Sequence, residues 1–434
     1  MIGALAGGRK GARGHSRGIG VGTSDPGKLR LCMVVTYAGS LGLARGQFAF
    51  LRDRGFEVTA VSSPGKQQDL ARAEGARTVA IPMERKTSIV RDLRALWRLY
   101  RFFRRNRFDV VNVSTPKAGL LGTLAARLTG HKRIVYVERG IYYETAAGLR
   151  RALYERIDKL VCRLASRVIP VSHEMGDWLV TRGICPPEKI RKIGCGSSNG
   201  VDSERFRRTP ERVEAGRGVR QQWEVPEDGI LIGTLARLVR DKGVEELVRA
   251  FVHLADRHPN AYLMLVGRYE SDDFPPPEMR ELIETHPRIR MTGWQQETER
   301  FYAALDIFAL PTYREGFPNT VLEASAMELP VVTTDIMGCR EAIVAGATGL
   351  GVPPRNWQAL ADALDRLIGD ADMRRRLGAA GRRRVVESYQ PRAVWNAVLD
   401  VYLELFGRTG RDNPSAPAPA PREAPGECEG DECP

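Results

Sequence analysis

The sequence predicts an α/β protein with two domains, each built on a doubly wound parallel sheet. The chain has 434 residues, which is more than a single hydrophobic core usually organises. Short apolar runs alternate with amphipathic segments, a pattern that favours parallel strands joined by crossover helices. A polar, strand-free stretch interrupts this alternation near the middle of the chain, and the pattern then begins again.

The first domain is predicted over residues 28–209. The basic, glycine-rich leader before it, 1–27, lacks the apolar segment of a secretory signal and is expected to be disordered. A glycine loop after the first strand leads into an amphipathic helix over 43–54. The strands of this domain are expected at 29–36, 57–61, 78–81, 109–113, 133–137 and 167–171.

The second domain is predicted over residues 229–390, after a linker over 210–228. A C-terminal helix is expected over 391–407, and packing of this helix on the first domain is one arrangement that the sequence allows. Residues 408–434 form a tail rich in proline, alanine and acidic residues, which buries too little apolar surface to become ordered. The strands of the second domain are expected at 230–235, 261–266, 289–292, 307–310, 331–334 and 349–352, and helices at 244–254, 277–285, 297–304 and 320–328.

The composition limits the classes of function. With 43% hydrophobic and 27% charged residues the chain resembles ordinary globular proteins, and no apolar run approaches the about 20 residues that a membrane-spanning helix needs. The net charge of +13 favours anionic partners such as phosphorylated small molecules or lipid headgroups. Nucleic acid is not expected, because no nucleic-acid-binding motif accompanies the charge. The seven cysteines lack metal-ligand spacing, which fits reduced thiols in the cytoplasm.

The most informative stretch follows the predicted strand at 307–310. Glu315 and Gly316 lie on the loop at the carboxyl end of that strand, and Pro318 suits the first turn of the next helix. Free main-chain N–H groups at this helix start would point into the cleft between the domains and bind an anion. Glu315 and Glu323 can reach the same ligand, and each carboxylate accepts two hydroxyl hydrogen bonds, as a sugar or ribose diol offers. The candidate binding residues at the helix start are Gly316, Phe317, Pro318, Asn319 and Thr320.

A second cluster contains two cations, Arg237 and Lys242, in the loop after the predicted strand at 230–235. Either residue alone is more often a solvated surface charge. Together, beside a helix start flanked by glutamates, they can clamp a diphosphate and neutralise its charge in place of a metal ion. We therefore expect no metal and no cofactor.

These motifs resemble those of the retaining glycosyltransferases of family 4, which have the GT-B fold. The family's hallmark is a Glu-x7-Glu motif, matched here by Glu315 and Glu323, and the resemblance covers roughly residues 29–406. The sequence is most similar to the capsular and exopolysaccharide type, or group 1, glycosyltransferases, judging from residues 115–122, 196–202 and 338–342. The resemblance implies transfer of a sugar from a nucleotide diphosphate sugar, with UDP as the expected nucleotide, and no need for a divalent metal.

The resemblance also implies a role for each matching residue. Arg237 and Lys242 would hold the diphosphate, and Glu315 would contact the hydroxyls of the donor sugar; these three are the predicted catalytic residues. Glu323 would bind the ribose hydroxyls. Gly39, in the first glycine loop, would approach the diphosphate from the first domain.

One position departs from the family pattern. Where many members have a histidine near the transferred sugar, this sequence has Arg139, whose permanent charge prevents it from acting as a base at neutral pH. Arg139 is instead a candidate for binding an anionic sugar or a phosphate on the acceptor. Glu138 and Lys117 are further candidates on the acceptor side.

Three alternatives remain open at this stage. The acceptor is either a lipid-linked saccharide or a small metabolite. The protein is alternatively a nucleotide-sugar 2-epimerase, an enzyme class with the same two-domain architecture. It is also compatible with a non-catalytic protein that binds sugar nucleotides.

The segment 89–107 combines aromatic and aliphatic residues with seven arginines. Most such helices pack an apolar stripe on the sheet and expose their charges to water. Arginines beside aromatic residues also suit the headgroup layer of an anionic membrane, so peripheral contact with the inner face of the plasma membrane is the alternative.

Overall fold

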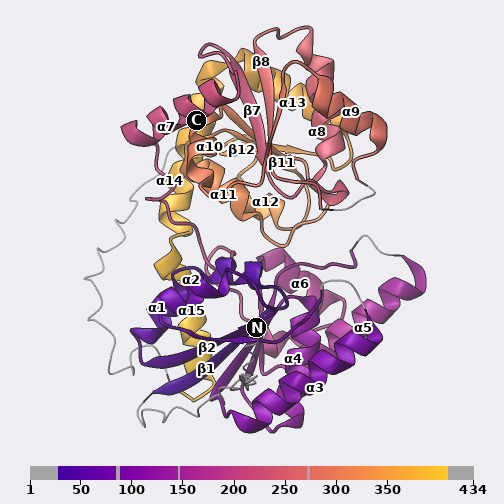
Figure 1. The fold of residues 1–434 in the computed structure, drawn as a ribbon, viewed down its shortest axis with the longest axis vertical. Helices are drawn as coiled ribbons and strands as arrows, with labels where there is room; N and C mark the ends of the chain where they lie inside the picture. Colours follow the sequence, from indigo (N-terminus) through magenta and orange to yellow (C-terminus); the bar gives the residue numbers. More distant parts are fainter. Residues whose placement is uncertain (1–27, 85–87, 145–146, 271–273, 409–434) are drawn as a thin grey trace, which may run out of the picture.

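The computed structural model describes residues 28–84, 88–144, 147–270 and 274–408. The predicted leader and nearly all of the predicted tail lie outside these residues. The chain forms two α/β domains stacked along the long axis of the molecule (Figure 1), each with a six-stranded parallel sheet between helices. The predicted fold class is confirmed.

The N-terminal sheet has the strand order β3-β2-β1-β4-β5-β6, which is the doubly wound order of nucleotide-binding folds. Its strands are short apolar runs that are buried on both faces, as parallel strands covered by helices require. Each predicted strand is present, with bounds that differ by up to two residues. The strands are β1 (Leu29–Val34), β2 (Phe56–Ser62), β3 (Arg77–Ala80), β4 (Val110–Ser114), β5 (Ile134–Glu138) and β6 (Arg167–Pro170).

The helix expected over 43–54 is divided into two elements. A 3₁₀ helix, η1, spans Ala38–Ala44, and the α-helix begins only after Gly46, whose φ of 81° no continuous right-handed helix can contain. The other helices of this domain cover both faces of the sheet. The helices are η1 (Ala38–Ala44), α1 (Gln47–Arg52), α2 (Gln68–Ala73), α3 (Ile89–Arg105), α4 (Pro116–Leu128), α5 (Gly148–Leu164), α6 (His173–Thr181) and η2 (Pro187–Lys189).

The C-terminal sheet repeats the same topology, in the order β12-β11-β10-β7-β8-β9. Its strands are also where the sequence places them. They are β7 (Ile230–Leu235), β8 (Ala261–Val266), β9 (Ile289–Gly293), β10 (Ile307–Leu310), β11 (Val331–Thr334) and β12 (Gly349–Val352). The helices are η3 (Arg240–Lys242), α8 (Val244–Ala255), α9 (Pro277–Thr285), α10 (Thr298–Ala304), α11 (Asn319–Ala326), α12 (Cys339–Ala342), α13 (Trp357–Gly369) and α14 (Ala371–Ser388).

The stretch expected as a linker is strand-free, but it contains a helix, α7 (Pro210–Gln222). Thr209 caps this helix by accepting from the main-chain N–H of Arg212. Helix α7 packs on α10 of the C-terminal domain, and Arg220 forms a 2.5 Å ion pair with Asp306. The segment therefore belongs structurally to the C-terminal domain.

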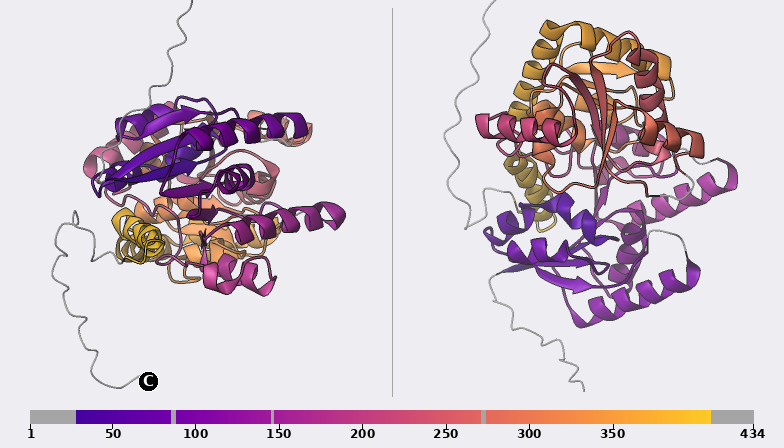
Figure 2. Two further views of the ribbon diagram at one scale, coloured as in Figure 1. Left: turned by 90° about the horizontal axis from the view of Figure 1, so that it is seen from below. Right: turned by 45° about the horizontal axis from the view of Figure 1, so that its top comes forward.

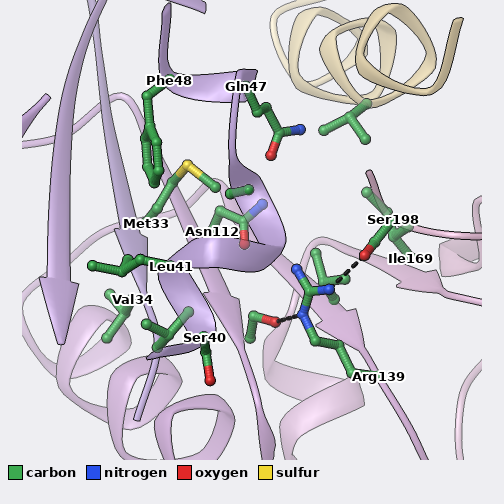
Figure 3. Close-up of a pocket in the computed structure, with 15 residues that line it drawn as sticks. Met33, Val34, Ser40, Leu41, Gln47, Phe48, Asn112, Arg139, Ile169 and Ser198 are labelled. Carbon is green, nitrogen blue, oxygen red and sulfur yellow. Dashed lines mark hydrogen bonds between the residues drawn. The ribbon is translucent and has the colours of Figure 1, made fainter. Parts of the chain in front are cut away.

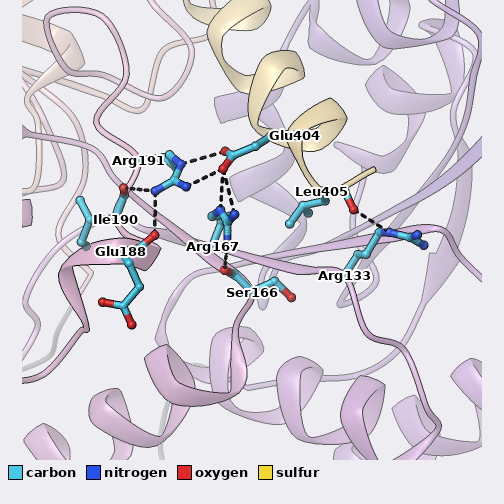
Figure 4. Close-up of polar contacts among 8 residues, drawn as sticks. All are labelled: Arg133, Ser166, Arg167, Glu188, Ile190, Arg191, Glu404 and Leu405. Atoms are coloured by element: carbon cyan, nitrogen blue, oxygen red, sulfur yellow. Dashed lines mark hydrogen bonds and ion pairs between the residues drawn. The ribbon is translucent and has the colours of Figure 1, made fainter. Parts of the chain in front are cut away.

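The last helix, α15 (Pro391–Glu404), returns to the N-terminal domain, as Figure 1 shows by its yellow colour among the indigo strands. Glu404 at its end lies 2.8 Å from Nη2 of Arg167 and 2.5 Å from Nη2 of Arg191 (Figure 4). Further inside, the amide of Asn112 on β4 donates to the hydroxyl of Tyr402 at 2.5 Å. The C-terminal helix α15 thus packs on the N-terminal sheet and connects the end of the chain to the first domain.

Candidate active site

A pocket, called here the cleft pocket, lies between the two domains. In doubly wound folds ligands bind at the carboxyl ends of the strands, and residues that follow β4, β5, β7 and β10 line this pocket. The lining residues are Thr115, Pro116, Arg139, Gly140 and Tyr142 from the N-terminal domain, and Arg237, Asp241, Lys242, Arg314, Glu315 and Gly316 from the C-terminal domain.

Lys242 and Glu315 form an ion pair at the floor of the cleft pocket, with 2.7 Å between Nζ and a carboxylate oxygen. Gly243, directly after Lys242, adopts a φ of 65°, and any Cβ there would lie 1.9 Å from the carbonyl oxygen of Pro311, so this loop requires glycine next to the lysine. The two side chains are mostly buried. The cation and the carboxylate that were expected to hold different parts of one ligand are therefore in direct contact.

The other cations of the C-terminal domain in this pocket are also paired. Arg237 is about half exposed and lies 2.9 Å from Glu270. Arg314 lies 2.8 Å from Asp241. The structure thus brings Arg237, Lys242 and Glu315 into one pocket, as the sequence motifs predict.

The start of helix α11 lies beside this pocket. The helix begins at Asn319, one residue before the expected range of 320–328, and Pro318, which was expected in its first turn, is the N-cap. No side chain caps the first turn, and among the described residues the N–H groups of Asn319 and Thr320 have no hydrogen-bond partner, so these two remain available to an anionic ligand. Phe317 is buried, and its ring lies 5.7 Å from that of Tyr389, a contact that helps to fix the loop. Thr320 is half-buried.

At Gly316 the backbones of the two domains approach each other closely. A Cβ at this position would be 1.9 Å from the carbonyl oxygen of Arg139. Only glycine fits there, so the loop of the Glu-x7-Glu motif packs directly on the end of β5.

An adjoining pocket shares Arg139, Glu315 and Gly316 with the cleft pocket. Its other lining residues are Leu43, Val171, Ser198, Phe317 and Asn319. It extends the site toward the loop that follows η2.

Glu323 lies one turn inside α11 and accepts a hydrogen bond of 2.8 Å from the hydroxyl of Tyr302. Burial raises the pKa of this carboxyl to about 7, although Tyr302 and Arg205 act in the opposite direction. It is not among the residues that line the cleft pocket or the adjoining pocket. A ligand that reaches Glu323 would meet a group close to half ionised at neutral pH.

Arg139 projects from the end of β5 into the site. Its Nε donates to the hydroxyl of Ser114 at 2.5 Å, and its Nη1 donates to the hydroxyl of Ser198. Burial lowers the pKa of the guanidinium to about 10, so it remains charged at neutral pH. Figure 3 shows the guanidinium pointing into a third pocket, the inner pocket, whose lining includes Met33, Leu41 and Phe48.

Two acceptor-side candidates face away from these pockets. Glu138 is buried in a cluster with Tyr136 and Asp158, and burial together with Asp158 raises its pKa well above the usual range. A carboxyl in this environment supports the fold rather than the site. Lys117 forms a 2.7 Å ion pair with Asp92 of α3. Neither residue is among those that line the three pockets.

Gly39 lies in η1 rather than in an open loop. It does not line any of these pockets, although Ser40 beside it lines the inner pocket.

Sequence reasoning missed a polar contact between the two domains. The carboxylate of Glu341 on α12 accepts from the main-chain N–H groups of His173 and Glu174, at 2.8 Å and 2.6 Å, at the start of α6 in the other domain. Arg340 beside it pairs with Glu174. A carboxylate at a helix start is favourable, but only the folded structure reveals that the helix and the carboxylate come from different domains.

The backbone strain at Thr115 was also not predicted from the sequence. This residue lines the cleft pocket and has a φ of 74°. Non-glycine residues rarely adopt this conformation, and such strain concentrates at functional sites. The hydroxyl of Thr36, 2.8 Å from that of Thr115, holds it in place. The local sequence carries no signal for this, because a residue before proline usually takes an ordinary extended conformation.

Within the described residues, no cluster of histidine, cysteine or acidic side chains is arranged to hold a metal ion. No helix in the same part of the chain is both long enough and apolar enough to cross a bilayer.

Two family models match the chain: glycosyl transferases group 1 over residues 218–384, and the glycosyl transferase 4-like domain over residues 43–196. The capsular polysaccharide biosynthesis glycosyltransferase CapM of Staphylococcus aureus is 31% identical over 369 residues, which are 85% of this chain and 95% of CapM. The chain belongs to the group 1 glycosyltransferases. This membership makes it a transferase, and it favours transfer over the epimerase and the non-catalytic protein that the sequence left open.

Two further similarities extend the comparison. The UDP-Gal:alpha-D-GlcNAc-diphosphoundecaprenol alpha-1,3-galactosyltransferase of Escherichia coli is 21% identical over 363 residues, 83% of this glycosyltransferase and 92% of the other chain. The crystal structure of HepE from Anabaena, in complex with UDP-glucose, superposes with a TM-score of 0.72 at 18% identity, covering 88% of this chain and all of HepE. That likeness confirms the GT-B fold.

Proposed function

We propose that this glycosyltransferase moves a sugar from a UDP-sugar to an acceptor hydroxyl with retention of the anomeric configuration. The observation that carries the proposal is the Lys242–Glu315 ion pair beside the uncapped start of α11, inside a pocket formed by both domains. A cation, a helix start and a carboxylate at one place match the diphosphate and the sugar hydroxyls of such a donor.

In this proposal Arg237, Lys242 and the N–H groups of α11 bind the diphosphate. The bond between the anomeric carbon and the diphosphate oxygen breaks, and negative charge builds on the leaving group, where these donors stabilise it. The acceptor oxygen bonds to the anomeric carbon on the same face, and its proton passes to a diphosphate oxygen. Glu315 exchanges its bond to Lys242 for bonds to sugar hydroxyls, and Glu323 accepts from the ribose.

Because protein cations neutralise the diphosphate in this scheme, the reaction needs no divalent metal. Incubation with UDP-, GDP- and TDP-sugars in excess chelator is expected to give slow donor hydrolysis with a UDP-sugar. Loss of this hydrolysis with EDTA, restored by Mg²⁺ or Mn²⁺, would contradict the metal-free scheme. Absence of hydrolysis with every donor, with or without metal, would contradict the donor assignment.

A lipid-linked saccharide is the acceptor we favour over a small metabolite. The name of the E. coli relative specifies a diphosphoundecaprenol-linked acceptor, and CapM is named for capsular polysaccharide biosynthesis. The surface of this chain supports the same choice. Helices α3 and α5 extend from the same side of the N-terminal domain, each packed on α4 between them (Figures 1 and 2).

Both helices leave apolar side chains in solvent. On α3 the exposed residues are Ile89, Val90, Leu93 and Trp97, and on α5 they are Leu149, Leu153 and Leu160. The inward stripe of α3 consists of Ala95, Leu99 and Phe103, so Leu93 and Trp97 are not needed for packing. Exposed arginines such as Arg94 and Arg98 lie among them. This combination supports peripheral contact with an anionic membrane, where lipid-linked acceptors reside.

A further inference from the structure

Four cations line the cleft pocket, and they differ in how their charge is compensated. The three from the C-terminal domain each face a carboxylate: Arg237 with Glu270, Lys242 with Glu315, and Arg314 with Asp241. Arg139, from the N-terminal domain, forms no ion pair within the described part of the chain. A desolvated cation without a counter-ion is costly, so proteins normally pair it.

The hydrogen bonds of Arg139 leave donors free. Ser114 and Ser198 accept from Nε and Nη1, and within the described residues neither serine hydroxyl donates elsewhere. Nη2 makes no hydrogen bond in the same part of the chain. The three side chains therefore present one guanidinium edge and two hydroxyl protons, which is a donor set suited to carboxylate or phosphate oxygens.

Arg139 shares the cleft pocket with the donor-binding groups but enters it from the other domain. It lines the cleft pocket, the adjoining pocket and the inner pocket, and so lies where the three meet. Its two serine partners also belong to the N-terminal domain: Ser114 ends β4, and Ser198 lies in the loop after η2. Lys242 and Glu315 approach from the opposite side of the cleft.

We infer that Arg139, held by Ser114 and Ser198, determines acceptor specificity by binding a carboxylate or phosphate group carried by the acceptor. The inference rests on the proposed function, and it further specifies that the acceptor carries a negative charge. An acceptor with its anionic group on Arg139 would direct a hydroxyl toward the sugar at Glu315 across the cleft.

Calorimetry with UDP and inorganic phosphate tests this inference. The wild-type protein saturated with UDP is expected to bind inorganic phosphate, and Arg139→Gln is expected to weaken that binding roughly tenfold or more while UDP affinity stays within a few-fold. Arg133→Gln is the matched control, because Arg133 precedes the same strand at the end remote from the cleft, where its side chain donates to the carbonyl of Leu405 and lies over the ring of Phe406. It should bind phosphate as the wild type does.

A second readout separates binding from a structural role. Removing an uncompensated charge should leave the melting temperature of the unliganded Arg139→Gln protein unchanged or higher, whereas a structural arginine would lower it. If Arg139→Gln does not fold, Ser198→Ala removes one hydroxyl donor and should weaken phosphate binding severalfold.

Several results would overturn the inference. Phosphate binding that is absent in the wild type, or equal in wild type and Arg139→Gln, contradicts it. A tenfold loss of UDP affinity in Arg139→Gln would assign the residue to the diphosphate instead. If Arg139→Gln loses affinity for UDP-glucuronic acid but not for UDP-glucose, Arg139 would be assigned to the donor sugar instead. If the wild type does not bind UDP at all, the proposed function fails first, and that outcome is distinct from the others.

Discussion

At the scale of single residues, the unliganded site is held by interactions that a substrate must replace. Glu315 accepts a hydrogen bond from Lys242, the cation that we expect to bind the diphosphate. Glu323 accepts one from the hydroxyl of Tyr302. Such pairs keep the side chains in position before the substrate arrives, which lowers the ordering cost of binding.

The pKa of Glu323 predicts a pH dependence of UDP binding. Burial holds this pKa at about 7 in the free protein, and ribose hydroxyls donate best to the ionised form. Binding below pH 7 must therefore release a proton, so UDP affinity should rise as the pH increases through 7 and then level off. Calorimetric titrations across this range measure the effect.

Glu323→Gln serves as the control for that titration, since it keeps the shape and removes the ionisable group. Ionisation of the UDP phosphate contributes equally in both proteins, so their difference isolates Glu323. Identical pH profiles for the two proteins would show that Glu323 does not contact the nucleotide.

Gly316 provides a prediction about contact between the domains. Gly316→Ala places a methyl group 1.9 Å from the carbonyl oxygen of Arg139 and must push the loop and β5 apart. A displacement of about 1 Å at a reacting centre costs on the order of 10²-fold in rate. Turnover should fall by that order while the melting temperature changes little.

The control is Gly351→Ala in β12, where a Cβ would meet nothing within 4 Å. If the two alanine variants have the same turnover, the close approach at Gly316 has no catalytic importance.

At the scale of elements, helix α15 depends on an ion-pair cluster at its end. Hydrogen bonds from Arg191 and Arg167 lower the pKa of Glu404 to about 2. An acid whose pKa is depressed on folding stabilises the protein above its unfolded pKa, and that contribution disappears as the pH falls toward the folded pKa.

Glu404→Gln should therefore lower the free energy of unfolding at pH 7 by on the order of 1 kcal/mol, since solvent screens a carboxylate that is more than one-third exposed. The deficit should shrink as the pH falls below the ordinary glutamate range toward 2. Urea denaturation at several pH values measures it. Glu387→Gln, an exposed residue of α14 without an ion pair among the described residues, should show no such trend. A deficit that is independent of pH would contradict the electrostatic origin.

The sequence predicts the strands better than the helices and the contacts. Buried parallel strands are short apolar runs that can be recognised locally, so all six expected strands in each domain are present. Helix α7 escaped prediction because it is mostly polar and is stabilised by packing on α10 and by Arg220, which are tertiary effects. The Glu-x7-Glu motif indicates the site, but the burial of Glu138 and the serine partners of Arg139 depend on side chains distant in sequence.

At the scale of the whole molecule, two features connect the domains to function. Glu341 and Arg340 on α12 hold α6 of the other domain, so the two domains are in direct contact beside the site. On the outside, the exposed apolar residues of α3 and α5 form the proposed membrane surface.

Sedimentation with anionic vesicles tests that surface. The wild type should bind at low salt and dissociate as salt increases, because arginine contacts with lipid headgroups are screened. Trp97→Ser should weaken binding severalfold. Trp294→Ser is the matched control, since that tryptophan is 62% exposed against 56% for Trp97 but lies in the C-terminal domain. If the two substitutions have equal effects, α3 is not part of the membrane surface. If the wild type does not bind vesicles, a soluble acceptor is favoured.

The central claim is that the pocket around Lys242 and Glu315 binds a nucleotide sugar without a metal. Calorimetric titration of UDP in excess EDTA, with the wild type and Lys242→Ala, tests it most directly. We expect the wild type to bind UDP and Lys242→Ala to bind it with an affinity at least about tenfold lower, because one charge-assisted contact to the diphosphate is lost. Equal UDP affinities for the two proteins, with unchanged turnover, would contradict it.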